Sequence, residues 1–518
     1  ESLRAGERVL RPFHWTVEFP EVFARQNTGF DAFVGNPPFL AGSEISGSLG
    51  DPYLKWLQHH FGTKGQVDLV ATFFLRAFDL IRNGGTFALL ATQTISRGDT
   101  RAAGLERIVH GGGIIYRARR RIPWTGQAAV TVSAIWVRRG QGFGDPILDE
   151  SKRPIITSFL LPSGPNTAPA RISSNRSKAF EGVKYTGQGF LFSENGGEPE
   201  TYASMDALIV DDPRNREVIR PLMRGEAFLE RPDLSPDRYI IDFNDFPEDK
   251  AREWPALLSI LERKVKASRA KGTKSENRPW WQFARTRPAL RAATRGLSRV
   301  IMRPKISVHN VFAFVGSDIL ISAPHVAITR EEMTAFSVIQ SRVHEIWTIN
   351  FGALLQDLFC YTPSDCFETF PFPDVLEADP ALEGAGQTYH DHRAALMVAR
   401  IEGMTKTYNR FHDLDERCED IVRLRELHAE MDRAVLRAYG WNDLAERAEP
   451  IFLDETNEDD HTYQGRLFWP SAFRDEVLAR LLALNASRHA EEVRLGIAPE
   501  IRAGVPEDEE DEEGDPVE

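Results

Sequence analysis

The chain has 518 residues, 42% of them hydrophobic and 27% charged, which is typical of a globular protein with room for roughly two to four domains. No apolar run approaches the roughly 20 residues that span a bilayer, and no secretory leader is evident, so we expect a cytoplasmic protein. The three cysteines, Cys360, Cys366 and Cys418, are too scattered for a disulfide framework and lack metal-ligand spacing, so no metal site is predicted. The net charge of −13 does not exclude a nucleic-acid partner, because nine acidic residues are concentrated in 507–518.

The segment around Asn36 joins a strand-like apolar run, Phe30–Gly35, to a stiff polar loop. Pro37 and Pro38 fix two φ angles and remove two N–H donors, so the strand must end there. Asn36 precedes a proline and is therefore held in an extended conformation. A side-chain amide, carbonyls without ladder partners and the ring of Phe39 can together grip a flat, amino-bearing base.

Further along the chain, helical and strand patterns alternate. Apolar residues recur with helical period over 67–81, and Asn83-Gly84-Gly85 follows as the expected end of that helix. Buried strands are predicted at 86–91, 114–116 and 128–137. This βαβ order predicts an α/β doubly wound sheet, whose ligands bind at the carboxyl ends of the strands. The Asn-Pro-Pro-Phe loop would lie at that edge.

The remaining patterns divide the chain into regions. We expect 1–143 to be the C-terminal half of a catalytic domain with a partial Rossmann-like sheet, 144–180 a linker, 181–375 a mixed α/β domain, 376–500 a helical domain and 501–518 an acidic disordered tail. The helical region lacks sustained heptads, so a packed bundle is favoured over a coiled coil.

The most basic stretch lies between Leu261 and Lys305, with fourteen lysines and arginines against two glutamates. Positive charge interleaved with aromatic rings suits a groove along a phosphate backbone. The alternative is an ordinary solvated surface of long basic side chains. We favour nucleic acid, and the candidate DNA-binding residues are Arg263, Lys264, Lys266, Arg269, Trp280, Trp281, Arg285, Arg287, Arg303 and Lys305.

Several segments resemble one family. Residues 35–39 resemble the catalytic Asn-Pro-Pro-(Tyr/Phe/Trp) motif of S-adenosylmethionine-dependent amino methyltransferases. The lead-in at 12–23 is similar to that of large adenine-specific DNA methyltransferases in type IIG and IIL restriction–modification enzymes and in phage-defence systems such as DISARM. Residues 279–288 and 361–373 resemble the target-recognition domain of the same enzymes.

The resemblance implies that duplex DNA is the partner and that a methyl group passes from S-adenosylmethionine to N6 of a flipped-out adenine. Asn36 and the Pro37 carbonyl would accept hydrogen bonds from the amino group, Pro38 would supply rigidity, and Phe39 would stack on the base. Trp124, or a residue just after it, would close the other face of the pocket.

Such enzymes carry a glycine-rich cofactor loop before the motif, and none is recognised before Asn36. The cofactor-binding residues therefore stay unknown apart from a contribution from Asn36, and we expect a missing N-terminal portion or a partner subunit to carry the loop. Two alternatives remain open: a catalytically incomplete DNA-specificity fragment, and an RNA or protein amino methyltransferase.

Overall fold

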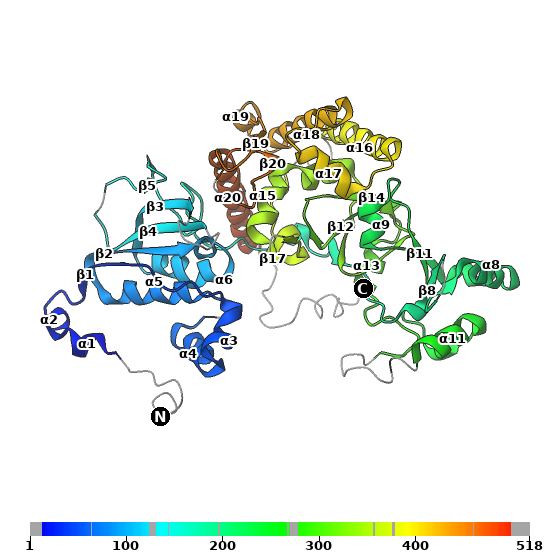
Figure 1. The fold of residues 1–518 in the computed structure, drawn as a ribbon, viewed down its shortest axis with the longest axis horizontal. Helices are drawn as coiled ribbons and strands as arrows, with labels where there is room; N and C mark the ends of the chain where they lie inside the picture. The colour runs from blue at the N-terminus through cyan, green and yellow to red at the C-terminus, as the bar shows by residue number, and fades with distance from the viewer. Residues whose placement is uncertain are drawn as a thin grey trace. The chain divides into compact units, whose positions relative to one another are not determined.

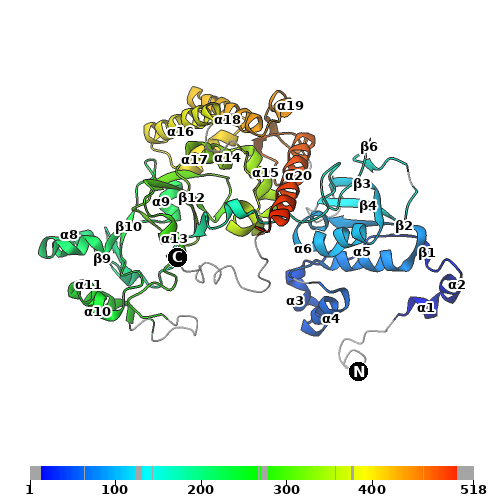
Figure 2. The ribbon, with the colours of Figure 1, turned by 180° about the vertical axis from the view of Figure 1, so that it is seen from behind.

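The structure is a computed structural model that describes residues 13–498, except 64, 124–130, 143, 195–196, 267–268, 270–277, 356–357, 375–378 and 459. It forms two compact units (Figures 1 and 2): unit 1 is Glu1–Ala168 with Glu455–His461, and unit 2 is Pro169–Asp454 with Thr462–Glu518. Among the described helices, none has the length and apolar character needed to span a bilayer.

Unit 1 is built on a six-stranded mixed sheet in the order β1-β2-β4-β3-β5-β6. The strands are β1 (Phe30–Gly35), β2 (Ile81–Thr92), β3 (Gly113–Pro123), β4 (Thr131–Arg139), β5 (Ile147–Leu148) and β6 (Ser151–Lys152). β1 is parallel to β2, and β3 is parallel to β5, whereas β4 is antiparallel to both of its neighbours. The α/β class predicted from the sequence is confirmed. Part of the stretch expected to be a linker, 144–180, instead adds β5 and β6 to this sheet and Ile156 and Leu160 to its core.

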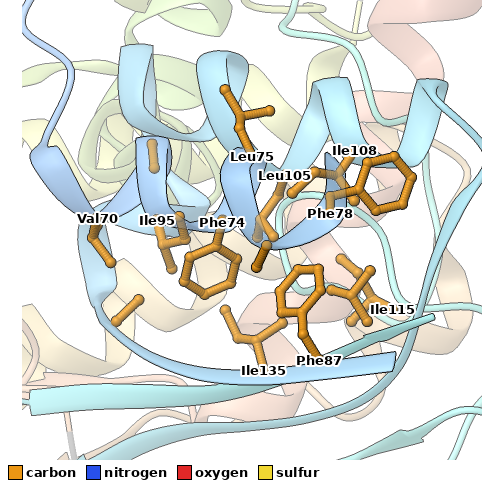
Figure 3. Close-up of a cluster of buried hydrophobic side chains, with 14 of the residues drawn as sticks. Val70, Phe74, Leu75, Phe78, Phe87, Ile95, Leu105, Ile108, Ile115 and Ile135 are labelled. Atoms are coloured by element: carbon orange, nitrogen blue, oxygen red, sulfur yellow. The ribbon is translucent and has the colours of Figure 1, made fainter. Parts of the chain in front are cut away.

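Helix α5 (Leu69–Leu80) covers the sheet and forms its core, as Figure 3 shows. Phe74 packs edge-to-face on Phe87 of β2 with ring centroids 5.6 Å apart, and Ile115 and Ile135 complete the layer beneath the helix. An apolar helix over an apolar strand is what the periodicity of 67–81 and 86–91 predicted.

The two glycines after α5 have a different role from the predicted one. The helix ends at Leu80, and the glycines lie inside β2, where the pairing with β1 shifts from Phe30 opposite Ile81 to Ala32 opposite Thr86. Gly84 adopts a φ of 79°, and a Cβ on Gly85 would lie 2.9 Å from the Phe30 carbonyl oxygen. The glycines therefore accommodate a β-bulge and not a helix cap.

Short elements precede β1 or connect the strands of unit 1. Before β1 are α1 (Trp15–Glu18) and α2 (Pro20–Phe23), and between strands are η1 (Gly42–Glu44), α3 (Ile45–Leu49), α4 (Asp51–Phe61), η2 (Gln93–Ser96), α6 (Gly98–Arg101), η3 (Ala102–Glu106) and α7 (Arg107–His110). The aromatic lead-in packs directly on β1. Trp15 makes edge-to-face contacts with Phe30 and Phe33, at centroid distances of 5.5 and 5.7 Å, and Phe19 lies 5.3 Å from Phe30. These rings hold the strand that leads into the Asn36 loop.

The described residues of unit 2 form four small sheets. Their orders are β15-β10-β11-β8-β9, β14-β12-β16-β7, β13-β18-β17 and β19-β20. The strands are β7 (Ala179–Glu181), β8 (Leu191–Ser193), β9 (Glu200–Thr201), β10 (Ile219–Met223), β11 (Arg238–Ile241), β12 (Arg299–Pro304), β13 (Ile306–Ser307), β14 (Ala313–Gly316), β15 (Leu320–Ile321), β16 (His325–Ile328), β17 (Ala353–Leu355), β18 (Leu358–Cys360), β19 (Ile451–Leu453) and β20 (Arg466–Phe468).

The helices of unit 2 fall into two groups. The first group accompanies the sheets: η4 (Ser173–Asn175), η5 (Gln188–Phe190), α8 (Tyr202–Asp211), η6 (Pro213–Glu217), α9 (Gly225–Glu230), α10 (Glu248–Ala251), α11 (Pro255–Leu261), η7 (Glu262–Lys266), α13 (Pro288–Ala293), α14 (Met333–Gln340), α15 (Arg342–Phe351) and η8 (Pro363–Phe367). The second is the predicted C-terminal helical region: α16 (Pro380–Arg400), α17 (Met404–His412), α18 (Glu419–Ala438), α19 (Asn442–Ala445) and α20 (Ser471–Leu495). α16 and α18 pack side by side in both views (Figures 1 and 2).

A buried ionic network joins the two parts of unit 2. Arg342 of α15 lies 2.5 Å from Asp432 of α18, both side chains are 1% exposed, and Arg342 also donates to the Leu467 carbonyl at 3.0 Å. Arg466 of β20 pairs with Glu345 of α15. Because a buried charge without its partner is costly, these pairs fix the helical region against α15.

Candidate active site and nucleic-acid-binding surface

The Asn-Pro-Pro-Phe loop begins where β1 ends. Gly35, the last residue of β1, pairs with Leu89 of the parallel strand β2, so the loop lies at the carboxyl edge of these two strands. Pro37 is buried, Asn36 is exposed, and the ring of Phe39 is 37% exposed. Within the described residues, the Asn36 side-chain amide makes no hydrogen bond. A buried proline therefore fixes a loop whose amide and aromatic ring remain accessible to a ligand.

Beyond Phe39, the loop is held by contacts to Asp68 and Leu69, which were not among the predicted site residues. Leu40 accepts a hydrogen bond from the Leu69 amide at 3.0 Å, and the Gly42 amide donates to the Asp68 carboxylate at 2.9 Å. Thr94, which follows β2, donates to the same carboxylate at 2.5 Å. The available signal was modest: an aspartate directly before a predicted helix and a threonine shortly after a predicted strand.

Two further sequence predictions concern a base-pocket residue and metal binding. Trp124, proposed to close the base pocket, lies outside the described residues. No group of three His, Cys, Asp or Glu side chains is placed to hold a metal ion in the part of the chain that the structure describes.

Three of the predicted DNA-binding residues lie in or near the core of unit 2. Arg303 is 1% exposed, donates to the Asn310 side-chain oxygen at 2.6 Å and lies over the Tyr361 ring at 4.4 Å. Burial lowers its pKa. Arg287 is 2% exposed and pairs with Glu181 at 3.0 Å, and Glu181 also pairs with Lys305. These contacts give Arg287, Arg303 and Lys305 roles in packing the sheets.

The other predicted basic residues are nearer the surface. Arg263 and Lys264 both pair with Glu200, at 2.7 and 3.1 Å, and the Arg263 side chain is 65% exposed. Lys266 is 51% exposed and pairs with Glu262. Because exposed ion pairs contribute little to stability, Arg263 and Lys266 can exchange a carboxylate partner for a phosphate at small cost. In the Lys264–Glu200 pair, by contrast, both side chains are only 18% exposed.

The aromatic candidates and two arginines support this surface. Trp280 lies under the Lys266 ammonium, which is 5.2 Å from its ring centroid, and Trp281 donates from Nε1 to the Phe246 carbonyl at 2.9 Å. Arg269 donates to the Pro279 carbonyl at 3.0 Å. Arg285 is half-buried, and its carbonyl accepts a hydrogen bond from the Lys184 amide at 3.0 Å. The tryptophans are thus partly packed and partly accessible, as a stacking surface requires.

Unit 2 also contains a cavity of about 310 Å³ that no sequence pattern indicated. Arg220, Arg291 and Arg295 line it together with Asn244. Arg291 pairs with Asp242 at 2.8 and 3.0 Å, whereas the Arg295 side chain is exposed and makes no hydrogen bond or ion pair within the described residues. Arg220 lies outside the basic stretch, so no sequence signal linked it to Arg295.

Comparisons with known proteins also separate the region of the Asn36 loop from the region of the basic stretch. Residues 4–108 match the model of the Eco57I restriction-modification methylase, and residues 171–374 match the target recognition domain of MmeI. The DNA methyltransferase A of Bacillus subtilis (strain 168) is 22% identical over 373 residues, which cover 69% of this chain and 41% of that protein.

Among solved structures, the type IIL restriction-modification enzyme MmeI in complex with DNA aligns with a TM-score of 0.53 and 18% identity. The alignment covers 89% of this chain and 57% of that one, so the likeness concerns the fold. The chain thus spans well under two thirds of either relative. The methylase match contains the Asn36 loop, and the target-recognition match contains the basic stretch and the arginine-lined cavity.

Proposed function

Because the chain combines part of an Eco57I-type restriction-modification methylase with an MmeI-type target recognition domain, we propose that it serves site-specific DNA methylation at adenine N6. The setting we propose is restriction–modification or phage defence. The observation that supports this most is the Asn36 amide, which is exposed beside a buried Pro37 and a partly exposed Phe39 at the carboxyl edge of parallel strands β1 and β2.

In the proposed reaction, the chain binds a base that has left the duplex, because the amino group of adenine cannot be reached inside the stack. The Asn36 side-chain oxygen and the Pro37 carbonyl accept hydrogen bonds from N6, which draws the nitrogen lone pair out of ring conjugation. Phe39 stacks on the base and fixes its plane. These groups contribute alignment and stabilisation of developing charge, and the proton released from N6 passes to solvent.

S-adenosylmethionine would supply the methyl group. The residues present fit this cofactor in two respects: the Phe39 ring can face a cationic sulfonium, and the Asn36 amide has no recorded hydrogen bond among the described residues. We propose that the remaining cofactor contacts come from a segment outside the described residues or from a partner subunit.

Unit 2 would hold the duplex. Arg263 and Lys266 offer exposed cations beside Lys264, Trp280 and Trp281 offer stacking rings, and the Arg295 cavity offers a second contact. Phosphate contacts from such cations set the position of the protein on DNA and supply most of the affinity.

The test is product analysis. The chain, alone and together with a segment carrying a cofactor loop, is incubated with isotope-labelled S-adenosylmethionine and, in parallel reactions, with duplex DNA, RNA or a protein extract. Nucleic acids are digested to nucleosides and proteins to peptides for mass spectrometry. We expect label in N6-methyladenine when the segment with the cofactor loop is present, and DNA binding without methyl transfer by the chain alone. Label only in RNA or in protein would support the alternative amino methyltransferase, and DNA binding without transfer in every combination would support a specificity fragment.

A further inference from the structure

The residue that precedes α5, Asp68, stands in the position of a helix cap but does not act as one. An aspartate there normally accepts a hydrogen bond from the second or third amide of its own helix. The Asp68 side chain makes no such bond. Oδ1 accepts from the Gly42 amide at 2.9 Å, and Oδ2 accepts from the Thr94 hydroxyl at 2.5 Å. Both oxygens are therefore directed to other segments.

Those two segments border the proposed base site. Gly42 lies three residues after Phe39, and Thr94 follows the end of β2 at Thr92. The Thr92 and Thr94 hydroxyls are 2.7 Å apart, so the hydrogen bonds continue from the end of β2 through Asp68 to the exit of the Asn36 loop. One half-buried carboxylate thus joins the loop exit to the carboxyl end of the strand beside it.

The backbone on either side of Asp68 packs closely against residues 40–42 of the loop exit. The Leu69 amide donates to the Leu40 carbonyl, and a Cβ on Gly42 would lie 2.6 Å from the carbonyl carbon of Gln66. The Asp68 amide itself donates to the buried Thr100 hydroxyl at 3.1 Å. The Asp68 backbone is therefore fixed by Thr100, while its carboxylate holds the loop at Gly42.

From these contacts we propose that Asp68 is a positioning residue for methyl transfer. It fixes the exit of the Asn36 loop so that the Asn36 oxygen, the Pro37 carbonyl and the Phe39 ring keep the geometry that a flipped base requires. This inference rests on the function proposed above. Displacing a reacting group by about 1 Å commonly costs about 100-fold in rate, so a loosened loop should slow the chemical step without weakening the hold on DNA.

The activity test uses the full enzyme in single-turnover methyl transfer with saturating DNA. We expect Asp68→Ala to lower the rate by about 10- to 100-fold while the dissociation constant for DNA stays within about 2-fold. Asp68→Asn should recover part of the rate, because its side-chain oxygen can still accept from the Gly42 amide and its NH₂ can donate to Thr94. Asp79→Ala is the matched control, since Asp79 is an exposed aspartate in the last turn of the same helix.

A second measurement does not depend on activity. Hydrogen exchange followed by mass spectrometry on the 518-residue chain should show faster exchange of peptides covering 39–46 in Asp68→Ala than in Asp79→Ala, with the α5 core unchanged. Gly42→Ala should give the same local effect, because the added methyl group forces the loop away from Gln66. General destabilisation would instead speed exchange throughout α5.

The outcomes separate this inference from the proposed function. Equal exchange at 39–46 in all variants, or an Asp68→Ala rate within about 2-fold of Asp79→Ala, would overturn the positioning role. Full activity in Asn36→Ala would instead remove the proposed function, whatever Asp68→Ala does. If Asp68→Ala fails to fold, Thr94→Val and Asp68→Asn decide the matter by the same exchange measurement.

Discussion

The Asn36 loop (residues 36–39) and the basic stretch at 261–305 were both predicted from a short run of residues, but they differ in how accessible their side chains are. The loop is accessible, and its backbone conformation follows from its own two prolines. Several cations of the basic stretch are paired with acids from other parts of unit 2, such as Glu181, Glu200 and Asp242. The prolines fix the backbone of the loop without contacts from other segments. Whether a charged side chain stays exposed depends instead on acidic partners from elsewhere in the chain.

The largest expected effect concerns stability within the basic stretch. Arg303→Ala should lower the free energy of unfolding by about 2–5 kcal/mol, because it leaves a cavity beside the Tyr361 ring and leaves the buried Asn310 side-chain oxygen without its donor. Arg263→Ala, an exposed member of the same stretch, should change it by no more than about 0.5 kcal/mol. Urea unfolding of both variants checks this. Similar midpoints for the two would mean that Arg303 is no more structural than its exposed neighbours.

A pH effect follows from the buried histidines of unit 2. Burial, followed by Arg466 and His309 nearby, places the pKa of His412 well below its ordinary value, and its Nδ1 accepts a hydrogen bond from the Leu467 amide. The unfolded chain then binds more protons below about pH 6.5, so stability should fall as pH falls from about 7 to 5, by at most about 1.4 kcal/mol per pH unit for this group. Thermal melting across this range checks it. In His412→Gln the slope should be shallower, and an unchanged slope would assign the pH dependence to other groups.

A smaller effect should separate the exposed cations from the buried ones. Replacing Arg263 and Lys266 together by Gln should weaken DNA binding by about 3- to 10-fold at low salt and reduce the salt slope by about 1–2, with stability unchanged. The matched control is Arg423→Gln with Arg447→Gln, two exposed, ion-paired arginines of the C-terminal helical region. If titration against salt gives the same slope for both double variants, the surface formed by residues 263–266 does not contact DNA.

Much of the fold was readable from sequence, and the reasons can be given residue by residue. Helix α5 and strand β2 were predicted because apolar periodicity determines which face is buried. The bulge at Gly84 and Gly85 was not, because the same glycines suit a helix end equally well, and only the register with β1 distinguishes the two. Arg303 was misplaced on the surface because an arginine in a buried strand is recognisable only once Asn310 and Tyr361 are placed around it.

The candidate site shows the same limit. Asn36 and Phe39 were found because the motif carries its own conformation, whereas Asp68 joins segments centred on residues 42, 68 and 94 that only folding brings together. Arg220 and Arg295 likewise reach one cavity from distant positions in the sequence. Residues whose role depends on such contacts leave little trace in a single sequence.

The most direct test of the proposed division of labour is single-turnover methyl transfer by Asn36→Ala in the complete enzyme, with saturating duplex DNA and labelled S-adenosylmethionine. We expect the rate to fall by about 1,000-fold or more, while the dissociation constant for DNA stays within about 2-fold, because Asn36 acts on the flipped base and unit 2 holds the duplex. A transfer rate within about 3-fold of the unmodified enzyme would contradict the assignment of the chemistry to the Asn36 loop.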